Sequence, residues 1–311
     1  MADLGHRRDT CPIVRALEIP FASPRLRRNR VEQPPPHVYF VGSAVFHYLG
    51  PSFAVLLFAR VDVLGVAWLR IASAAAVFAL WRRPWRPLAR LDRGGWLLVG
   101  CLGLVFALMN VAFYVAIDRL PLATVAAIEF IGPVALALAG LRSVRNLGAV
   151  VAAIAGVYLL THLRFAGQPA GVAFAFANAA LFTIYIVLAH RLARRPATGG
   201  IDGLAAAMLV AFLFVSPIGS VGAAPAFADP VTLAAGIGVG VTSSVIPYVF
   251  DQLAMARLAR ETYALFVALL PATAAVIGVV VLSQLPSRLD LVGIVLVMLG
   301  VALHRPEGAA T

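Results

Sequence analysis

Ten apolar runs, each close to the length of a membrane-spanning helix, follow one another between residues 37 and 304. A helix needs about 20 residues, within a range of about 17–25, to cross the hydrocarbon core of a bilayer. The runs cover residues 38–58, 62–81, 95–117, 122–141, 147–163, 171–189, 204–222, 231–250, 263–283 and 289–304. They lack the period-two alternation of a membrane barrel. The sequence therefore predicts an all-α polytopic membrane protein with ten transmembrane helices.

The composition excludes the common soluble classes. Hydrophobic residues make up 61% of the chain and charged residues 13%, against about 45–50% and about 25% in soluble domains. Such an excess cannot be buried in one water-soluble core, which argues against a cytosolic enzyme and against a disordered chain. The two cysteines, Cys11 and Cys101, indicate neither a disulfide framework nor a metal cluster.

The basic residues indicate the orientation of the chain. All 25 are arginines, against 14 acidic residues. If the N-terminus is cytoplasmic, 20 arginines fall on cytoplasmic segments, four fall on the opposite side and Arg70 lies inside a span. Positive residues favour the cytoplasmic side, so we expect both termini in the cytoplasm. This distribution explains the charge without a nucleic-acid partner.

The two ends differ from the apolar part of the chain. Residues 1–36 hold seven arginines and end in three prolines. We expect a disordered basic cytoplasmic tail, with weak attraction to anionic headgroups as the functional alternative. No apolar stretch of signal-peptide length follows the first arginines closely, so a cleaved signal is not expected. Residues 305–311 are expected to form a short cytoplasmic tail.

An internal repeat relates two stretches of the chain. Residues 116–133 align without a gap on residues 254–271, at an offset of 138 positions. The matched residues are Arg119 with Arg257, Leu120 with Leu258, and Pro133 with Pro271. The two prolines lie inside predicted spans, where each removes a helical hydrogen bond. We expect kinks there, serving either as gating hinges or as packing bends.

The repeat divides the apolar part of the chain into two units. The first five-helix repeat is expected to cover residues 37–163 and the second residues 164–304. Because five is odd, the second unit enters the membrane with opposite polarity. Inverted repeats of this kind are a design of secondary transporters, with the substrate site near the midplane between the halves.

Four polar residues are predicted to share one layer inside the membrane. Arg70 and Glu129 lie eight and seven residues below the outer ends of their predicted spans, a depth of roughly 10–12 Å. Their equal depth and opposite charge make an ion pair possible. Asn110 and Asn178 lie at a similar depth. Buried charges are expensive in a membrane and usually have a partner or a function.

Each of these residues has a structural and a functional interpretation. The pair Arg70 and Glu129 either locks two helices together or also lines a substrate cavity. Asn110 and Asn178 either bond neighbouring helices or bind substrate. His47 and Tyr48 lie slightly deeper in the first span. Tyr48 is a further substrate-binding candidate, and His47 is either a proton carrier or a packed neutral side chain.

Motifs of enzymes and ATP-driven pumps are missing from the sequence. It contains no HExxH, no CxxC, no phosphate-binding loop and no GxGxxG element that opens a helix after a strand. We therefore expect no metal, no cofactor and no enzymatic activity. An intramembrane enzyme would need Asp, His or Ser groups converging at one membrane face, whereas a receptor or scaffold would need large soluble loops.

Several segments resemble the EamA family of the drug/metabolite transporter superfamily. The best match, YVAIDRLPLATVAAIEFIGPVALAL at residues 114–138, is similar to the branch of inner-membrane threonine/homoserine exporters. GPSFAVLLF, WLRIAS, VIPYVFDQLAMARL and ALLPATAAV support it. The sequence departs from the branch at Val55, where a lysine is usual, at Leu270, where a glutamate is usual, and at Ser283 and Gln284, which replace a Gly-Glu pair.

The resemblance implies ten helices in two inverted five-helix repeats, a location in the cell (inner) membrane, and secondary transport coupled to protons. We accordingly expect export of a small amino acid or related zwitterion across the inner membrane by alternating access. Arg70 would receive the carboxylate. Glu129 would receive the ammonium group or carry the coupled proton. A multidrug or other metabolite exporter of the same fold is an alternative, as is a non-transporting receptor or scaffold.

Overall fold

The computed structural model describes residues 35–89, 91–132, 144–193, 201–255 and 270–303. Throughout these ranges the elements are helices, and none of the described residues forms a β-strand. The prediction of an all-helical chain is therefore confirmed. The predicted tail 1–36 lies outside the described residues except for its last two, and the tail 305–311 lies wholly outside them.

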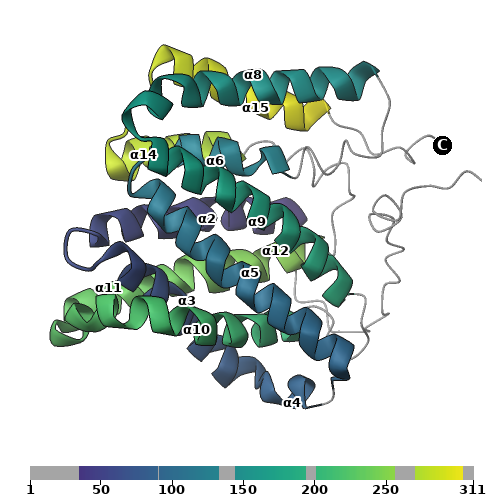
Figure 1. Ribbon diagram of the computed structural model, residues 1–311, viewed down its shortest axis with the longest axis vertical. Coiled ribbons are helices and arrows are strands. Elements are labelled where there is room, and N and C mark those ends of the chain that lie inside the picture. The colour runs from purple at the N-terminus through teal and green to yellow at the C-terminus, as the bar shows by residue number, and fades with distance from the viewer. Residues whose placement is uncertain (1–34, 90, 133–143, 194–200, 256–269, 304–311) are drawn as a thin grey trace, which may run out of the picture.

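The helices follow the predicted apolar runs in order (Figure 1). They are α2 (Pro36–Leu57), α3 (Val63–Arg82), α4 (Trp85–Leu88), α5 (Arg93–Ile117), α6 (Leu122–Glu129), α8 (Val144–Gly167), α9 (Pro169–Ala193), α10 (Ile201–Ala223), η1 (Ala224–Ala228), α11 (Pro230–Gly240), η2 (Val241–Val245), α12 (Ile246–Met255), α14 (Leu270–Leu282) and α15 (Arg288–Leu303). The eighth predicted run corresponds to α11, η2 and α12, which continue one another.

Six helical stretches of the described chain are long and apolar enough to cross a membrane. They are Val38–Leu57, Val63–Arg82, Arg93–Ile117, Pro169–Ala189, Ile201–Ala228 and Pro230–Phe250. Two shorter apolar helices, Leu147–Leu160 and Leu270–Leu282, match the fifth and ninth predicted runs. The fourth and ninth runs are only partly described. The count of ten transmembrane helices therefore stays a prediction, while a polytopic membrane protein is confirmed.

Short polar side chains fix where several helices begin. Asp62 and Asp92 precede α3 and α5, and their carboxylates accept from backbone N–H groups of the first turn. Asp229 does the same for α11. At the start of α15 the Ser287 hydroxyl and the Asp290 carboxylate each accept from the other residue's backbone N–H, at 3.2 and 2.9 Å. This reciprocal capping box explains the sharp start of α15.

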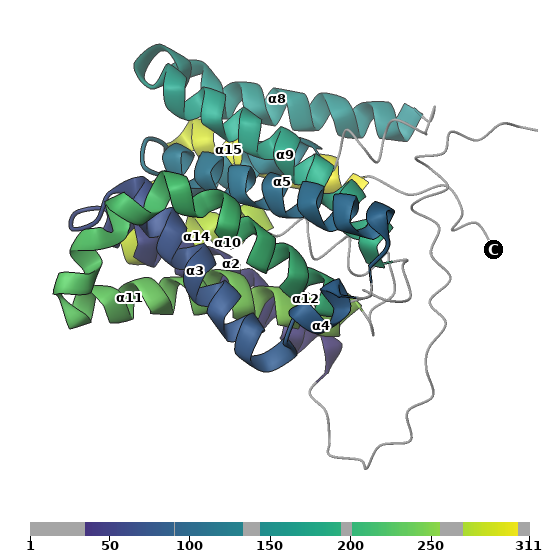
Figure 2. The same ribbon diagram turned by 60° about the horizontal axis from the view of Figure 1, so that its bottom comes forward.

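The helices pack side by side, with the short loops α2–α3, α5–α6 and α8–α9 at one end (Figure 1). Helices α8 and α15 pack together at one edge, and α3 packs with α10 towards the other edge (Figures 1 and 2). Between them, α2 contacts α11, α12 and α14, while α9 contacts α5 and α6. Helix α6 also contacts α14. This middle set surrounds the site described below.

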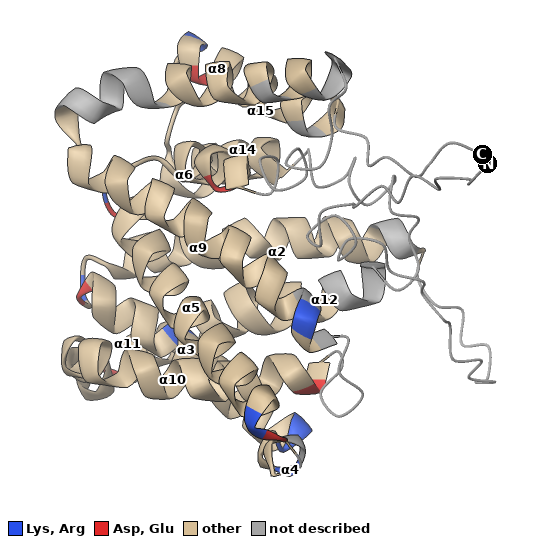
Figure 3. Ribbon diagram, turned by 45° about the vertical axis from the view of Figure 1, so that its right-hand side comes forward, with Lys and Arg blue, Asp and Glu red and all other residues tan. Residues whose placement is uncertain are grey.

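Charged residues gather mostly at the helix ends, and most of the described helical length between them carries no charged residue (Figure 3). Arg82 and Asp202 form an ion pair of 2.6 Å between the end of α3 and the start of α10. Large apolar side chains such as Leu80 and Val221 are more than four-fifths exposed. In water such a surface would be unfavourable, whereas in a bilayer it faces lipid tails.

Candidate functional site

A small cavity lies between helices α2, α3, α5, α6, α9 and α12, and we call it the central cavity. Its polar lining residues are His47, Arg70, Asn110, Glu129 and Asn178. Its aromatic lining residues are Phe106, Phe113, Phe182 and Tyr248. The volume is about 20 Å³, which is room for about one water molecule. The four residues that the sequence places in one layer therefore line one cavity.

Arg70 is held by a neighbouring helix and an aromatic ring. Its Nε donates to the Ser244 hydroxyl at 2.9 Å, and its Nη2 donates to the Ser243 carbonyl at 3.3 Å. The guanidinium carbon lies 5.4 Å from the centre of the Tyr114 ring, a cation–π contact. A guanidinium has five N–H donors, so these two bonds leave three donors.

The ion pair between Arg70 and Glu129, which equal depth and opposite charge made possible, is not formed in this structure. The two residues line the same cavity, but the ion pairs among the described residues join other partners. The physical reason is that serines 243 and 244 already bind the guanidinium, while an amide binds the carboxylate. The two charges are thus separately placed on one cavity wall.

Glu129 is buried at the last residue of α6, and Asn178 of α9 binds it. The Asn178 Nδ2 donates to Glu129 Oε1 at 3.2 Å. Asn110 of α5 bonds similarly to another helix, because its Nδ2 donates to the Ala67 carbonyl of α3 at 3.0 Å. Both amides therefore join helices, as their structural interpretation expected, and both also line the cavity.

Three buried acceptor atoms on the cavity residues have no hydrogen-bond partner among the residues that the structure describes. They are Glu129 Oε2, Asn178 Oδ1 and Asn110 Oδ1. The amide orientations follow from chemistry, because a carboxylate and a carbonyl accept only and must face the NH₂ side of each amide. A buried acceptor without a donor is costly. The central cavity therefore offers acceptors around Glu129 and donors on Arg70.

The adjacent residues His47 and Tyr48 point to different surroundings. His47 lines the central cavity. Tyr48 is fully buried in the main apolar cluster, is not among the residues lining the cavity, and its ring meets that of His47 edge-on at 5.2 Å. The Tyr48 hydroxyl is nevertheless close enough to Glu129 to interact with it electrostatically, so substrate binding by Tyr48 stays a prediction.

Only one of the two prolines that are predicted to kink helices lies within the described residues. Pro133 lies outside the described residues. Pro271 is the second residue of the described part of α14 and is buried. Because residues 256–269 are also outside the described part, the predicted kinks stay predictions.

Sequence reasoning missed the serines that hold Arg70. Ser243 and Ser244 lie in η2, a π-helical turn in the middle of the predicted eighth span, and both are buried. A signal was available, since two adjacent serines followed three residues later by Pro247 interrupt an apolar run. Irregular helical turns of this kind are common at functional sites.

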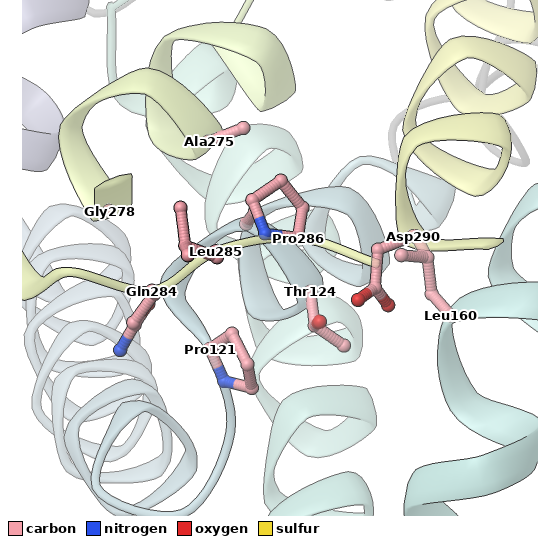
Figure 4. Close-up of a pocket in the computed structure, with 10 residues that line it drawn as sticks. Pro121, Thr124, Leu160, Ala275, Gly278, Gln284, Leu285, Pro286 and Asp290 are labelled. Atoms are coloured by element: carbon pink, nitrogen blue, oxygen red, sulfur yellow. The ribbon is translucent and has the colours of Figure 1, made fainter. Parts of the chain in front are cut away.

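A second, larger pocket opens near the loop between α14 and α15, and we call it the outer pocket (Figure 4). Its volume is about 180 Å³, and its wall includes Thr124, Gln284 and Asp290. The Gln284 Oε1 accepts from the backbone N–H of Leu122, the first residue of α6, at 3.0 Å. Ser283, with a φ of 55°, makes the turn before it.

No cluster of three or more potential metal-ligating side chains occurs within the described ranges. The sequence gives no reason to expect a metal, and the central cavity combines one guanidinium, one carboxylate and amides. Such a set binds small charged groups through hydrogen bonds and ion pairs.

Comparison with known proteins identifies the family. The threonine/homoserine exporter RhtA of Escherichia coli (strain K12) is 32% identical over 253 residues, which cover 79% of this chain and 82% of that protein. RhtA of Salmonella typhimurium (strain LT2) is 32% identical over 243 residues, covering 76% and 79%. Residues 169–304 match the EamA-like transporter family. The chain belongs to the EamA-like transporter family.

Membership in this transporter family, together with the membrane-length helices, makes the chain a multi-pass membrane transport protein. The resemblance noted in the sequence is thereby confirmed. A crystal structure with 18% sequence identity matches with a TM-score of 0.55, covering 86% of this chain and 97% of the other. At that identity the likeness shows a shared fold and nothing more.

Proposed function

We propose that this EamA protein is a secondary transporter of the cell (inner) membrane that exports an amino acid or a related zwitterion by alternating access. In this proposal ten helices form two inverted five-helix repeats, with both termini in the cytoplasm. The RhtA relatives support the class of cargo, because their names state export of threonine and homoserine.

The central cavity is the observation that carries the proposal. A zwitterion has one carboxylate and one ammonium group, and the cavity has a matching set. Arg70 keeps three N–H donors for a carboxylate. The acceptors of Glu129, Asn178 and Asn110 without partners suit the three N–H donors of a primary ammonium. Each charge of the cargo would thus meet an opposite or hydrogen-bonding group.

Alternating access is supported by the small size of the cavity. About 20 Å³ is too little for an amino acid. In this proposal, cargo therefore binds while the surrounding helices are further apart than they are here. Proline-containing helices and a site between repeats are features of rocking transporters.

The helix contacts support the repeat. If α2, α3, α5, α6 and α8 correspond to α9, α10, the α11–α12 helix, α14 and α15, the packing should be symmetric. Helix α5 packs on α9, and the α11–α12 helix packs on α2. Helix α6 packs on α9, and α14 packs on α2. The pairs α3 with α10, α6 with α14 and α8 with α15 join corresponding helices.

Proton coupling is the finer part of the proposal. Glu129 and His47 are the titratable candidates besides Arg70 on the cavity wall. A proton on Glu129 would remove the charge that attracts the ammonium group, so protonation and cargo binding would alternate. The test is efflux driven by an imposed pH gradient. Equal rates with and without the gradient would separate export from proton coupling.

The main experiment is efflux from proteoliposomes loaded with labelled amino acids. L-threonine, L-homoserine, leucine and phenylalanine cover polar and apolar side chains. The wild type should release at least one of them, while Arg70→Ala and Glu129→Gln should release little. If both variants transport as well as the wild type, the proposed site is wrong.

A multidrug exporter is the second candidate, favoured by the aromatic part of the wall. Phe106 contacts Tyr248 and Tyr185 at ring distances of 5.7 and 5.6 Å, and Phe182 stacks on Tyr185. Aromatic walls bind apolar and cationic drugs. Cells that overexpress the protein would then tolerate dyes and hydrophobic amines, whereas an amino-acid exporter gives tolerance to amino-acid analogues.

A further inference from the structure

The eighth predicted span contains a π-helical turn beside Arg70. Helices α11 and α12 are joined by η2 without a break, and the residues flanking the turn keep right-handed helical angles. The N–H of Ile246 bonds to the carbonyl of Val241, five residues earlier. The turn therefore holds one more residue than an α-helical turn, which displaces the carbonyls on one side.

Pro247 explains why a carbonyl is available in this turn. Proline has no backbone N–H, so the carbonyl four residues earlier, that of Ser243, loses its α-helical donor. Inside a membrane such a carbonyl needs another donor. Arg70 provides it through Nη2, and its Nε adds the bond to the Ser244 hydroxyl. The guanidinium thus completes a helix that the proline leaves incomplete.

Close packing fixes the turn against two other helices. A Cβ added at Gly50 of α2 would lie 2.7 Å from the Ser243 backbone nitrogen. A Cβ added at Gly240 would lie 2.6 Å from the Arg70 carbonyl oxygen. Both distances are too short for a real side chain, so glycine is required at both positions. The π turn is therefore held in place rather than free to shift.

We propose that Ser244, together with the π turn, is a positioning residue for Arg70. This inference rests on the proposed function, in which Arg70 takes the carboxylate of the cargo. The Ser244 hydroxyl fixes Nε and the Ser243 carbonyl fixes one N–H of Nη2, so the plane of the guanidinium is set before cargo arrives. Pre-set donors bind a carboxylate better because less side-chain freedom is lost on binding.

The position of Arg70 also indicates how the binding of a carboxylate would affect both predicted repeats. Arg70 belongs to α3, in the first predicted repeat, whereas Ser243 and Ser244 belong to the second. The guanidinium is thus a direct polar link between the two units, on the wall of the central cavity. A cargo carboxylate that binds Arg70 contacts both units through one side chain.

The test compares Ser244→Ala with Ser243→Ala. Both serines are buried in the same turn, but only the Ser244 hydroxyl binds Arg70. The Ser243 hydroxyl does not bond to Arg70 but lies beside the Tyr114 hydroxyl, and the Ser243 carbonyl remains after substitution. The matched pair therefore separates the loss of one hydrogen bond to Arg70 from the loss of a buried oxygen in the π turn.

Pro247→Ala is a second variant that does not depend on the serine hydroxyl. Alanine restores an N–H that competes with Arg70 for the Ser243 carbonyl. Alanine is also a better helix former than proline, so this variant should not lose folding stability through helix propensity. A transport defect in Pro247→Ala would therefore reflect the position of Arg70.

The readout is proteoliposome transport of L-threonine and its competition by L-threonine amide, which lacks the carboxylate. In Ser244→Ala the KM for L-threonine should rise about tenfold, the order expected for one hydrogen bond to a charged group. Pro247→Ala should show a rise in the same direction. The amide should compete equally well in all variants, and Ser243→Ala, which keeps the carbonyl that Arg70 uses, should raise the KM for L-threonine clearly less than Ser244→Ala.

Two failures are distinguishable in this design. If the wild type moves none of the amino acids in the efflux panel, the proposed function is wrong and the inference falls with it. If another amino acid of the panel is moved instead, that acid and its amide replace the threonine pair. If the wild type transports and Arg70→Ala does not, but Ser244→Ala behaves like Ser243→Ala, the positioning role alone is wrong. Equal losses for acid and amide in Ser244→Ala would also overturn it, because a merely structural defect would affect both.

Discussion

The central cavity and the outer pocket differ in a way that volume does not predict. The outer pocket is larger, about 180 Å³ against about 20 Å³. Its polar groups are matched locally, since Asp290 accepts from Ser287 and Gln284 accepts from Leu122. In the central cavity Glu129 Oε2 and two amide oxygens have no hydrogen-bond partner within the described part of the chain.

This difference indicates where binding energy is available. Polar groups that already have partners gain little from a ligand, whereas buried acceptors without donors gain a full hydrogen bond each. The central cavity is thus the better candidate for binding a charged cargo, whereas the outer pocket is the better candidate for a place where helices are held together. The following experiments test that contrast, starting with the largest expected effect.

Two isosteric substitutions compare the buried carboxylates of the two pockets. Glu129→Gln keeps the shape and an oxygen for Asn178, but removes the charge that would meet an ammonium group. Efflux should fall by about 30-fold or more, the order of 2 kcal/mol expected for removing one partner of a buried charge pair. Initial rates from proteoliposomes, normalised to reconstituted protein, measure the loss.

Asp290→Asn is the matched control for this loss. Its carboxylate lies on the outer pocket and bonds to Ser287. Transport should stay within about twofold of the wild type, as expected for a change outside the site. If Asp290→Asn were as defective as Glu129→Gln, the distinction between the two regions would be lost.

Methylation of the cargo tests the acceptors of the central cavity. A primary ammonium offers three N–H donors, and each N-methyl group removes one. Affinity should fall about tenfold for each lost donor, because an acceptor bound to a charged group is then left unpaired. Competition of labelled L-threonine efflux by glycine, sarcosine, dimethylglycine and betaine gives the series. Equal competition by all four compounds would show that the protein does not recognise the ammonium group through hydrogen bonds.

The helices and the polar layer could be predicted because both depend on position along one helix. Apolar runs give the helices, and a rise of about 1.5 Å per residue gives the depth of Arg70, Asn110, Glu129 and Asn178. Depth needs no knowledge of neighbouring helices. The structure brings these four side chains to one cavity, in keeping with that calculation.

The hydrogen-bond partners of these side chains, and the direction in which each side chain faces, could not be predicted, because both depend on how neighbouring helices pack. Successive helical residues differ by about 100° in direction, so His47 lines the cavity whereas its neighbour Tyr48 is not among the lining residues. The bond from Arg70 to Ser244 joins residues 174 positions apart. Opposite charge suggested Glu129 as the partner, yet the serines of the π turn hold the guanidinium.

Gln284→Ala tests whether the outer pocket only holds helices together or also binds cargo. The substitution leaves the Leu122 N–H at the start of α6 without its acceptor, and α6 carries Glu129 at its other end. We expect the maximal rate to change by about two- to threefold, the order of a weak net hydrogen bond, with the KM unchanged. Gln284→Glu keeps an acceptor and should transport normally. A large KM change in Gln284→Ala would place cargo in the outer pocket.

Ser287→Ala should affect stability and leave transport intact. It removes half of the capping box at the start of α15, which costs about 1 kcal/mol. In a chain of this size that corresponds to a decrease in melting temperature of about 2 °C. Melting of purified protein in detergent, together with the efflux rate, gives both values. An unchanged KM together with a lower melting temperature would fit a purely structural role for the residues around the outer pocket.

The smallest expected effect concerns Asp229, an exposed carboxylate outside the membrane-length helices. The hydrogen bond from the Thr232 hydroxyl, followed by the Val231 N–H, lowers the pKa of this carboxyl below its usual range. A lowered pKa in the folded protein stabilises the fold above the pKa of the unfolded chain, about 4, and this contribution is lost as pH falls through the folded pKa. Asp229→Asn should therefore melt slightly below the wild type at pH 7, and the difference should shrink as the pH falls below about 4. Transport at pH 7 should be unchanged, because the Asp229 carboxylate already accepts hydrogen bonds at the start of its helix, as the Asp290 carboxylate does. A transport defect in Asp229→Asn without a change in melting would mean that locally matched carboxylates also act in export, and would contradict the contrast between the two regions.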